Sequence, residues 1–166
     1  SFSYEVATKH TRFFRQYGVS GVYFFVYGVS AKSSSLGPKK YPARQTREAF
    51  EAIARSHQLD PRNSVFAQQN PLAIDAGVFH NDVISVGNRE LLFFHEKAFL
   101  NTNEVKSDLD KAMGAGNMRY IEVPSASVSL EDAVTSYLFN SQLLSVPNTE
   151  GSVMVVPADV AATAAV

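Results

Sequence analysis

The stretch Val22-Tyr-Phe-Phe-Val-Tyr-Gly-Val29 is rich in aromatic and β-branched residues and follows the glycines Gly18 and Gly21. A short apolar run of these residue types, bounded by turn residues, is typical of a strand that is buried on both faces. It is far shorter than the roughly 20 residues that a membrane-spanning helix needs. We therefore expect a core strand here and no membrane span.

A helix and a second strand are predicted on the C-terminal side of this strand. Residues 32–40 are mostly polar and indicate a loop. Apolar side chains then recur at helical spacing after Pro42, a residue that suits the first turn of a helix. Residues 42–58 are therefore predicted to form an amphipathic helix, and residues 65–69 to form the next strand.

A hairpin is the next predicted element. Residues 79–86 and 91–95 have the composition of strands, and the Gly87-Asn88 pair between them suits a tight hairpin turn. Residues 97–113 should then form a helix that ends at Gly114.

Strands and helices also alternate in the last third of the chain. Residues 120–123 are predicted to form a strand, residues 129–144 a helix that begins at Ser129, and residues 153–156 a final strand. The order gives repeated strand-strand-helix-strand units and hence the α/β class. No Gly-rich phosphate loop is present, so nucleotide binding has no support.

The composition indicates a globular protein. The chain has 166 residues, of which 45% are hydrophobic and 19% charged, so it is one ordinary domain in size. Its 15 basic and 16 acidic residues leave no excess of positive charge, and we expect no nucleic-acid partner. The lack of cysteine and of a signal-like start favours a cytoplasmic setting. The chain opens on Ser1 rather than on methionine, and residues 158–166 at its end are mostly alanine and valine. We therefore expect the chain to be a piece of a longer protein.

Polar groups that could carry chemistry gather between residues 68 and 82. On a strand His80 and Asp82 would share one face, while Asn81 would point to the other. An imidazole can transfer protons near neutral pH, and a carboxylate can bind a guanidinium through paired hydrogen bonds. Amidine hydrolysis needs both groups.

Other interpretations of these side chains remain open. A histidine next to an aspartate is more often a structural hydrogen-bonded pair than a catalytic one. Metal binding by His80 and His95 would lack a third ligand, so no metal is expected. Arg44 and Arg47 could bind a substrate carboxylate, although surface arginines are more common. Glu5 could orient a histidine, or it could be an ordinary exposed residue.

Four segments resemble consecutive motifs of the N-succinylarginine dihydrolases, which belong to the guanidine-modifying pentein superfamily. They are residues 41–47 (Tyr-Pro-Ala-Arg-Gln-Thr-Arg), 66–71 (Phe-Ala-Gln-Gln-Asn-Pro), 77–82 (Gly-Val-Phe-His-Asn-Asp) and 137–144 (Tyr-Leu-Phe-Asn-Ser-Gln-Leu-Leu). Their order and spacing agree over residues 26–156. The resemblance implies a five-bladed α/β propeller built from strand-strand-helix-strand modules. Residues 1–166 would be a single incomplete propeller domain of about two modules.

The resemblance also implies a function in arginine catabolism. Members of the family use a Cys-His-Glu triad, without a cofactor, to convert N2-succinylarginine to N2-succinylornithine, ammonia and carbon dioxide. The histidine would be His80 and the acidic member Glu5, whose surroundings lack the family's glycines. Arg44 would bind the anionic end of the substrate, and Asp82 the guanidinium.

The family's nucleophile lies in a Gly-rich segment with an Ala-Cys-Leu core, which has no counterpart in this chain. We therefore expect the chain alone to be inactive. Two alternatives stay open: a non-catalytic relative that binds guanidino or dicarboxylate ligands, and an amidine hydrolase for another arginine derivative. A homo-oligomer is also an open expectation.

Overall fold

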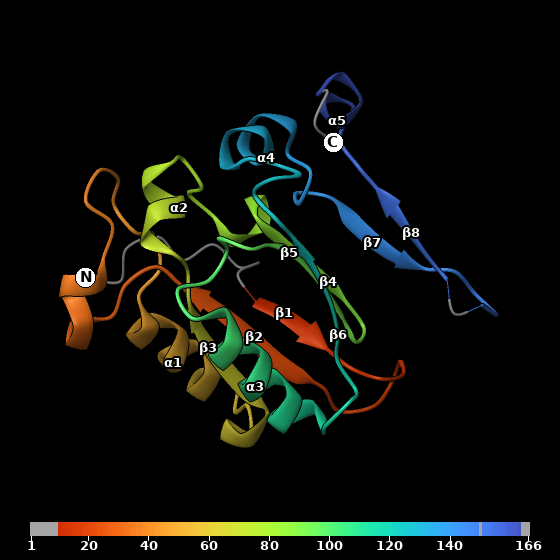
Figure 1. Ribbon diagram of the computed structural model, residues 1–166. Coiled ribbons are helices and arrows are strands. Elements are labelled where there is room, and N and C mark those ends of the chain that lie inside the picture. Colours follow the sequence, from red (N-terminus) through yellow and green to blue (C-terminus); the bar gives the residue numbers. More distant parts are fainter. Residues whose placement is uncertain (1–9, 150, 164–166) are drawn as a thin grey trace.

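The predicted core strand is β2 (Val22–Tyr27), which lies between the antiparallel β1 (His10–Phe13) and the parallel β3 (Ser64–Gln68) (Figure 1). The computed structural model describes residues 10–149 and 151–163. The strand ends two residues earlier than predicted, because Val29 forms an isolated bridge with Thr46 instead. The β3 prediction is confirmed, whereas β1 was not predicted.

Both faces of β2 are buried, as its composition predicts. Phe24 and Val26 belong to the main hydrophobic core, while Phe25 and Tyr27 pack with the side chains of α1 (Arg47–Ser56) on the other face. Because successive side chains point to opposite faces, a strand between two apolar layers must be apolar at every position.

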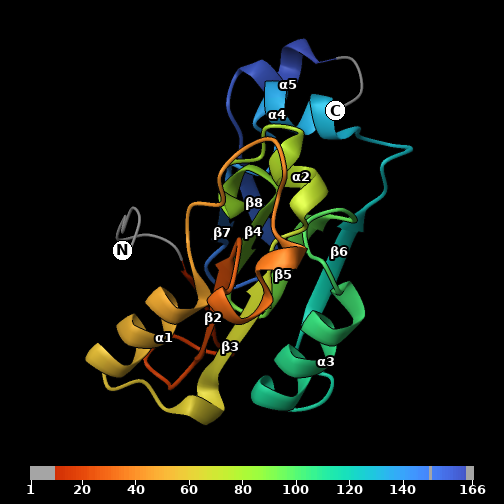
Figure 2. The ribbon, with the colours of Figure 1, turned by 90° about the vertical axis from the view of Figure 1, so that its left-hand side faces the viewer.

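A second unit repeats the order of the first. Strand β4 (Ser85–Asn88) is antiparallel to β5 (Leu91–His95), and α3 (Thr102–Met113) leads to β6 (Arg119–Val123), which is parallel to β5. Figure 2 shows α1 and α3 on opposite sides of β3. The predicted strand-strand-helix-strand order is thus present twice in the described part of the chain.

A third small sheet follows α4 (Leu130–Ser136). It consists of the antiparallel strands β7 (Gln142–Ser145) and β8 (Ser152–Val155), and the short α5 (Asp159–Ala162) comes after it. The three sheets remain separate within the described residues, so the fold is mixed α/β with small sheets.

The first strands of the three sheets lie next to one another, β1 against β4 and β4 against β7. The approach is close at Gly87, where an added Cβ would lie 2.7 Å from Phe13 Cε1 and 2.9 Å from Thr11 Cγ2. A larger residue at this point would have to displace the buried Phe13 ring and the Thr11 side chain.

Two predicted helices begin later than expected. The first begins at Arg47 rather than Pro42, because the Thr46 side chain accepts a hydrogen bond from the Ala49 N–H and caps it. The helix predicted for residues 97–113 begins at Thr102. The Leu100 N–H donates to the Gln68 carbonyl and Phe99 forms a bridge with Gln69, so the residues before the helix are bonded to the first sheet instead. Its predicted end at Gly114, with φ +87°, is confirmed.

The helix predicted for residues 129–144 is wrong in its second half. Its start is confirmed by a capping box between Ser129 and Asp132. It ends at Ser136 because Tyr137 adopts a left-handed conformation (φ 55°), and residues 142–145 form β7.

The strand predicted for residues 79–86 is also wrong. Residues 71–75 form the short helix α2 (Pro71–Asp75), capped by Asn70, and a 3-10 helix, η3 (Asn81–Val83), precedes β4. The hairpin exists, but its turn residues are Arg89 and Glu90 rather than Gly87-Asn88. Arg89 supplies the positive φ of 55°.

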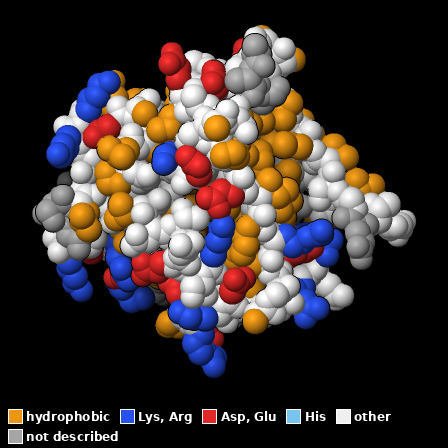
Figure 3. Space-filling model, viewed as in Figure 1, with side chains coloured by type: hydrophobic (Ala, Val, Ile, Leu, Met, Phe, Trp, Pro, Cys, Tyr) orange, Lys and Arg blue, Asp and Glu red, His pale blue; other side chains and the backbone are white. Residues whose placement is uncertain are grey.

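Two further 3-10 helices lie in the connections, η1 (Ala31–Leu36) in the predicted loop and η2 (Pro61–Asn63) before β3. In the part that the structure describes, no helix has the length and hydropathy to span a bilayer. Acidic and basic side chains are interspersed on the face shown in Figure 3.

Candidate functional site

The loop that leads to Arg44 is anchored by Asp75 at the end of α2. Its carboxylate accepts backbone N–H bonds from Lys39 at 2.9 Å, Lys40 at 2.7 Å and Tyr41 at 3.1 Å. These bonds, the one from Lys39 first, hold the pKa of the Asp75 carboxyl below its usual value. The charged carboxylate thus fixes the loop from its N-terminal side.

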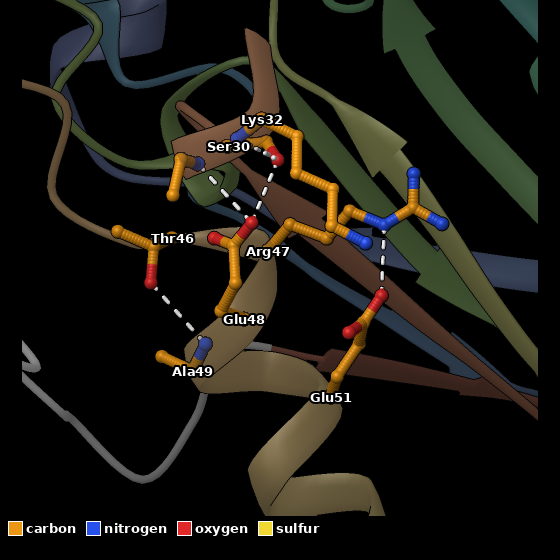
Figure 4. Close-up of polar contacts among 8 residues, drawn as sticks. Ser30, Lys32, Thr46, Arg47, Glu48, Ala49 and Glu51 are labelled. Atoms are coloured by element: carbon orange, nitrogen blue, oxygen red, sulfur yellow. Dashed lines mark hydrogen bonds and ion pairs between the residues drawn. The ribbon is translucent and has the colours of Figure 1, made fainter. Parts of the chain in front are cut away.

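The C-terminal side of the same loop is anchored at the start of α1 (Figure 4). The Glu48 carboxylate accepts bonds from Ser30 Oγ at 2.8 Å and from the Ala31 N–H at 3.1 Å. These hydrogen bonds, with that of Ser30 the largest cause, lower the pKa of the Glu48 carboxyl. The Gly28 N–H also donates to the Gln45 carbonyl at 2.9 Å. Arg44 is therefore held next to the end of β2.

Arg44 and His80 are brought together by the fold. Arg44 Nη1 lies 3.2 Å from His80 Nε2, and the Arg44 guanidinium lies 5.7 Å from the ring centre of Phe79. A guanidinium can only donate, so His80 Nε2 must accept, and the ring proton must be on Nδ1 in this arrangement. Residues 36 positions apart in sequence thus form one polar contact.

His80 and Asp82 do not share a strand face, which corrects the prediction. His80 is extended and precedes η3, whereas Asn81 and Asp82 are the first two residues of that 3-10 helix. In a 3-10 helix successive side chains are turned by about a third of a circle, so Asn81 and Asp82 can face the same space.

That space is a cavity of about 140 Å³ where the three sheets meet. Asn81, Asp82 and Gln45 line it, but His80 and Arg44 do not. The other lining residues come from β1, β2, β4 and the segment before β7: His10, Thr11, Phe24, Val26, Ser85, Val86, Gly87, Phe139, Asn140 and Ser141.

Three buried polar atoms at the cavity have no hydrogen-bond partner among the described residues. They are Gln45 Nε2, Asn81 Oδ1 and Ser141 Oγ, and the Gln45 residue is only 8% exposed. Such atoms cost roughly 1–3 kcal/mol each unless something satisfies them. The sequence prediction missed Gln45 and Ser141, although both lie within the quoted motifs.

The lining of the cavity is not positively charged. It contains no lysine or arginine among the described residues, and its one histidine is His10. Desolvation, and to a lesser degree the nearby His57, lower the pKa of the His10 imidazole. The exposed Asp82 is the charged residue of the lining.

The glutamines and the asparagine that precede α2 have structural roles. Gln68 Nε2 donates to the carbonyls of Gly28 and Leu36, and Gln69 Nε2 donates to the Val78 carbonyl. The Asn70 side chain caps α2. None of these three side chains lines the cavity.

Two other candidate residues, His95 and Arg47, do not line the cavity. His95 is fully buried, and its ring nitrogens lie 2.9 Å from the Val128 carbonyl and 3.0 Å from the Lys97 N–H. Arg47 pairs with Glu51 at 2.9 Å. No cluster of three metal-ligating side chains occurs among residues 10–149 and 151–163. Glu5 lies outside the described residues.

Comparisons with known proteins agree on one family. A family model described as succinylarginine dihydrolase matches residues 1–166. The chain is 61% identical over 144 residues to the N-succinylarginine dihydrolase of Aliivibrio fischeri, covering 86% of this chain and 32% of that protein. The corresponding enzymes of Aeromonas hydrophila and Pseudomonas fluorescens are 54% and 56% identical over 92% and 93% of this chain. The chain spans about a third of the length of these relatives.

Proposed function

The chain belongs to the succinylarginine dihydrolase family, and we propose that the full-length protein that carries it hydrolyses N2-succinylarginine. The products are N2-succinylornithine, two molecules of ammonia and one of carbon dioxide, formed with two molecules of water. The observation that supports this proposal is the Arg44–His80 contact beside the cavity lined by Asp82.

His80 acts as general acid and base in this proposal. The His80 Nε2 lone pair accepts a hydrogen bond from Arg44 in this structure, so the imidazole takes up a proton at Nε2 when that hydrogen bond opens. It then protonates the departing ammonia and later removes a proton from the attacking water. The covalent step needs a thiolate, which this chain does not contain, so the nucleophile belongs to another segment.

Arg44 and Asp82 bind opposite ends of the substrate. The exposed Arg44 guanidinium suits the carboxylates of the succinyl end, and the Asp82 carboxylate suits the substrate guanidinium. His80 contacts Arg44 and comes two residues before Asp82, which supports a role near the reacting carbon of a substrate that spans Arg44 and Asp82.

The repeated units support a propeller as the fold of the full-length protein. Two units with the order strand-strand-helix-strand, and a third pair of strands, bring their first strands together around the cavity. Further units of this kind would close the ring.

We also propose Glu5 as the acidic member of the triad and a cytoplasmic setting for this catabolic reaction.

Mixing the purified full-length protein with N2-succinylarginine tests the proposal. We expect two molecules of ammonia and one of N2-succinylornithine for each substrate molecule, and much slower turnover of free arginine, which lacks the succinyl carboxylates. The 166-residue chain alone is the control and should release none. If the full-length protein releases no ammonia but its melting temperature rises with substrate, the protein is a binding relative instead.

A further inference from the structure

The cavity contains hydrogen-bond donors and acceptors that have no partner among residues 10–149 and 151–163. Asn81 Oδ1 is an acceptor, Gln45 Nε2 is a donor, and Ser141 Oγ can serve as either. The three come from different segments of the chain, yet they line one cavity of about 140 Å³. One water molecule occupies roughly 30 Å³ in the liquid, so the space holds a larger group.

The charged side chains differ between the cavity lining and its surroundings. Arg44 and its contact with His80 lie outside the lining, while the next residues, Gln45 and Asn81, line the cavity together with Asp82. A ligand that extends from Arg44 into the cavity has a first position against a cation and a second against a carboxylate and neutral polar groups. An anionic group fits the first position and an N–H-rich group fits the second.

The proposed reaction places two different groups in that second position. A guanidinium has only N–H donors. Its hydrolysis by one water releases one ammonia and leaves a ureido group, in which a carbonyl oxygen has replaced one nitrogen. The second water then cleaves the ureido group to the amine, carbon dioxide and the second ammonia. A site that serves both steps needs hydrogen-bond acceptors for the N–H groups in each step. It also needs one donor for the carbonyl oxygen of the ureido group.

We propose that Gln45 is the residue that lets the second hydrolysis proceed, because its Nε2 donates a hydrogen bond to the ureido oxygen of the intermediate. Asn81 Oδ1 and the Asp82 carboxylate accept N–H bonds from the guanidinium and the ureido group alike. This inference rests on the proposed function and specifies the subsite that its two steps share.

The unpartnered state of Gln45 Nε2 supports this role. The Gln45 residue is 92% buried, and its backbone carbonyl is fixed by the N–H groups of Gly28 and Val29. The backbone that carries the donor is therefore held in place before a ligand arrives, which reduces the entropy lost on binding. A buried donor that serves no structural bond is expected to have a ligand as its partner.

Two substitutions in the full-length protein separate the steps. Gln45→Glu keeps the size of the side chain but replaces the amide donor with a charged acceptor, and Gln45→Leu removes the donor and the acceptor. We expect each to lower kcat/KM for N2-succinylcitrulline, the ureido compound, by about 10- to 100-fold. The release of the first ammonia from N2-succinylarginine should fall less than the turnover of the ureido compound does with Gln45→Leu, so the ureido compound should accumulate. Gln16→Leu, at an exposed glutamine outside the cavity, is the control.

The outcomes distinguish this inference from the proposed function. Equal losses in both steps, or no loss in either, at unchanged melting temperature would overturn the role of Gln45. If the wild-type protein releases no ammonia, the proposed function fails, and calorimetry with N2-succinylcitrulline then tests the subsite alone. A Gln45→Leu affinity equal to that of the wild type overturns the subsite, and a loss of tenfold or more supports it.

Discussion

Replacing His80 with alanine in the full-length protein is expected to lower ammonia release from N2-succinylarginine by about 100- to 10,000-fold, the usual contribution of a general acid–base residue. The imidazole accepts from Arg44 through Nε2, so it is held at a fixed place beside Arg44. Alanine can neither protonate the departing ammonia nor activate the water. Because both chemical steps need the proton transfer, kcat should fall more than the substrate affinity.

The matched control for His80 is His57→Ala. His57 is an exposed histidine at the end of α1, and it lies outside the cavity. Its removal should leave ammonia release within about threefold of the wild type, because surface substitutions usually have small effects. A His80→Ala protein that melts normally and keeps more than a tenth of the wild-type rate would refute the assignment of His80.

The second large effect is expected at Arg44. Arg44→Ala should raise KM for N2-succinylarginine by about 10- to 100-fold, because a hydrogen bond to a charged group contributes roughly 1.5–3 kcal/mol. Since free arginine lacks the succinyl carboxylates, its turnover should change less, and the preference for the succinylated substrate should shrink. Arg44→Lys should lie between, because it keeps the charge but not the planar pair of donors.

Arg44 also touches His80, so its loss affects kcat as well. Initial rates at several substrate concentrations separate the two parameters. Arg55→Ala removes an exposed arginine near the end of α1 and serves as the control. An unchanged ratio of the rates for succinylated and free arginine in the Arg44→Ala protein would show that Arg44 does not bind the succinyl end.

The core strands were predictable because local composition and burial agree. The run at residues 22–29 is apolar at every position that two buried faces require, and β5 carries a similar short run. The helix start at Ser129 followed from a capping residue and two acidic residues in the first turn. In each case the residues of one short segment were sufficient to predict its secondary structure.

Boundaries that depend on distant partners were not predictable. Pro42 suits a helix start, but the Gln45 carbonyl is taken by the end of β2, so the helix begins at Arg47. Residues 97–101 have helical composition, yet their backbone bonds to the first sheet. Tertiary hydrogen bonds override local propensity at both places.

The candidate site was predicted in part. The motifs pointed to Arg44, His80 and Asp82, and the fold brings Arg44 and His80 into contact. A strand assumed for residues 79–86 put Asn81 on the wrong face, because a 3-10 helix replaces it. Ser141 could not be predicted, because it reaches the cavity only through the packing of β7 against β4.

A crystal structure of the full-length His80→Ala protein with N2-succinylarginine tests the proposed site most directly. We expect a succinyl carboxylate within hydrogen-bond distance of Arg44 and the guanidinium in the cavity, within hydrogen-bond distance of the Asp82 carboxylate and Asn81 Oδ1. A substrate bound in the reverse direction, or bound outside this cavity with Arg44 and Asp82 untouched, would contradict the site proposed for this chain.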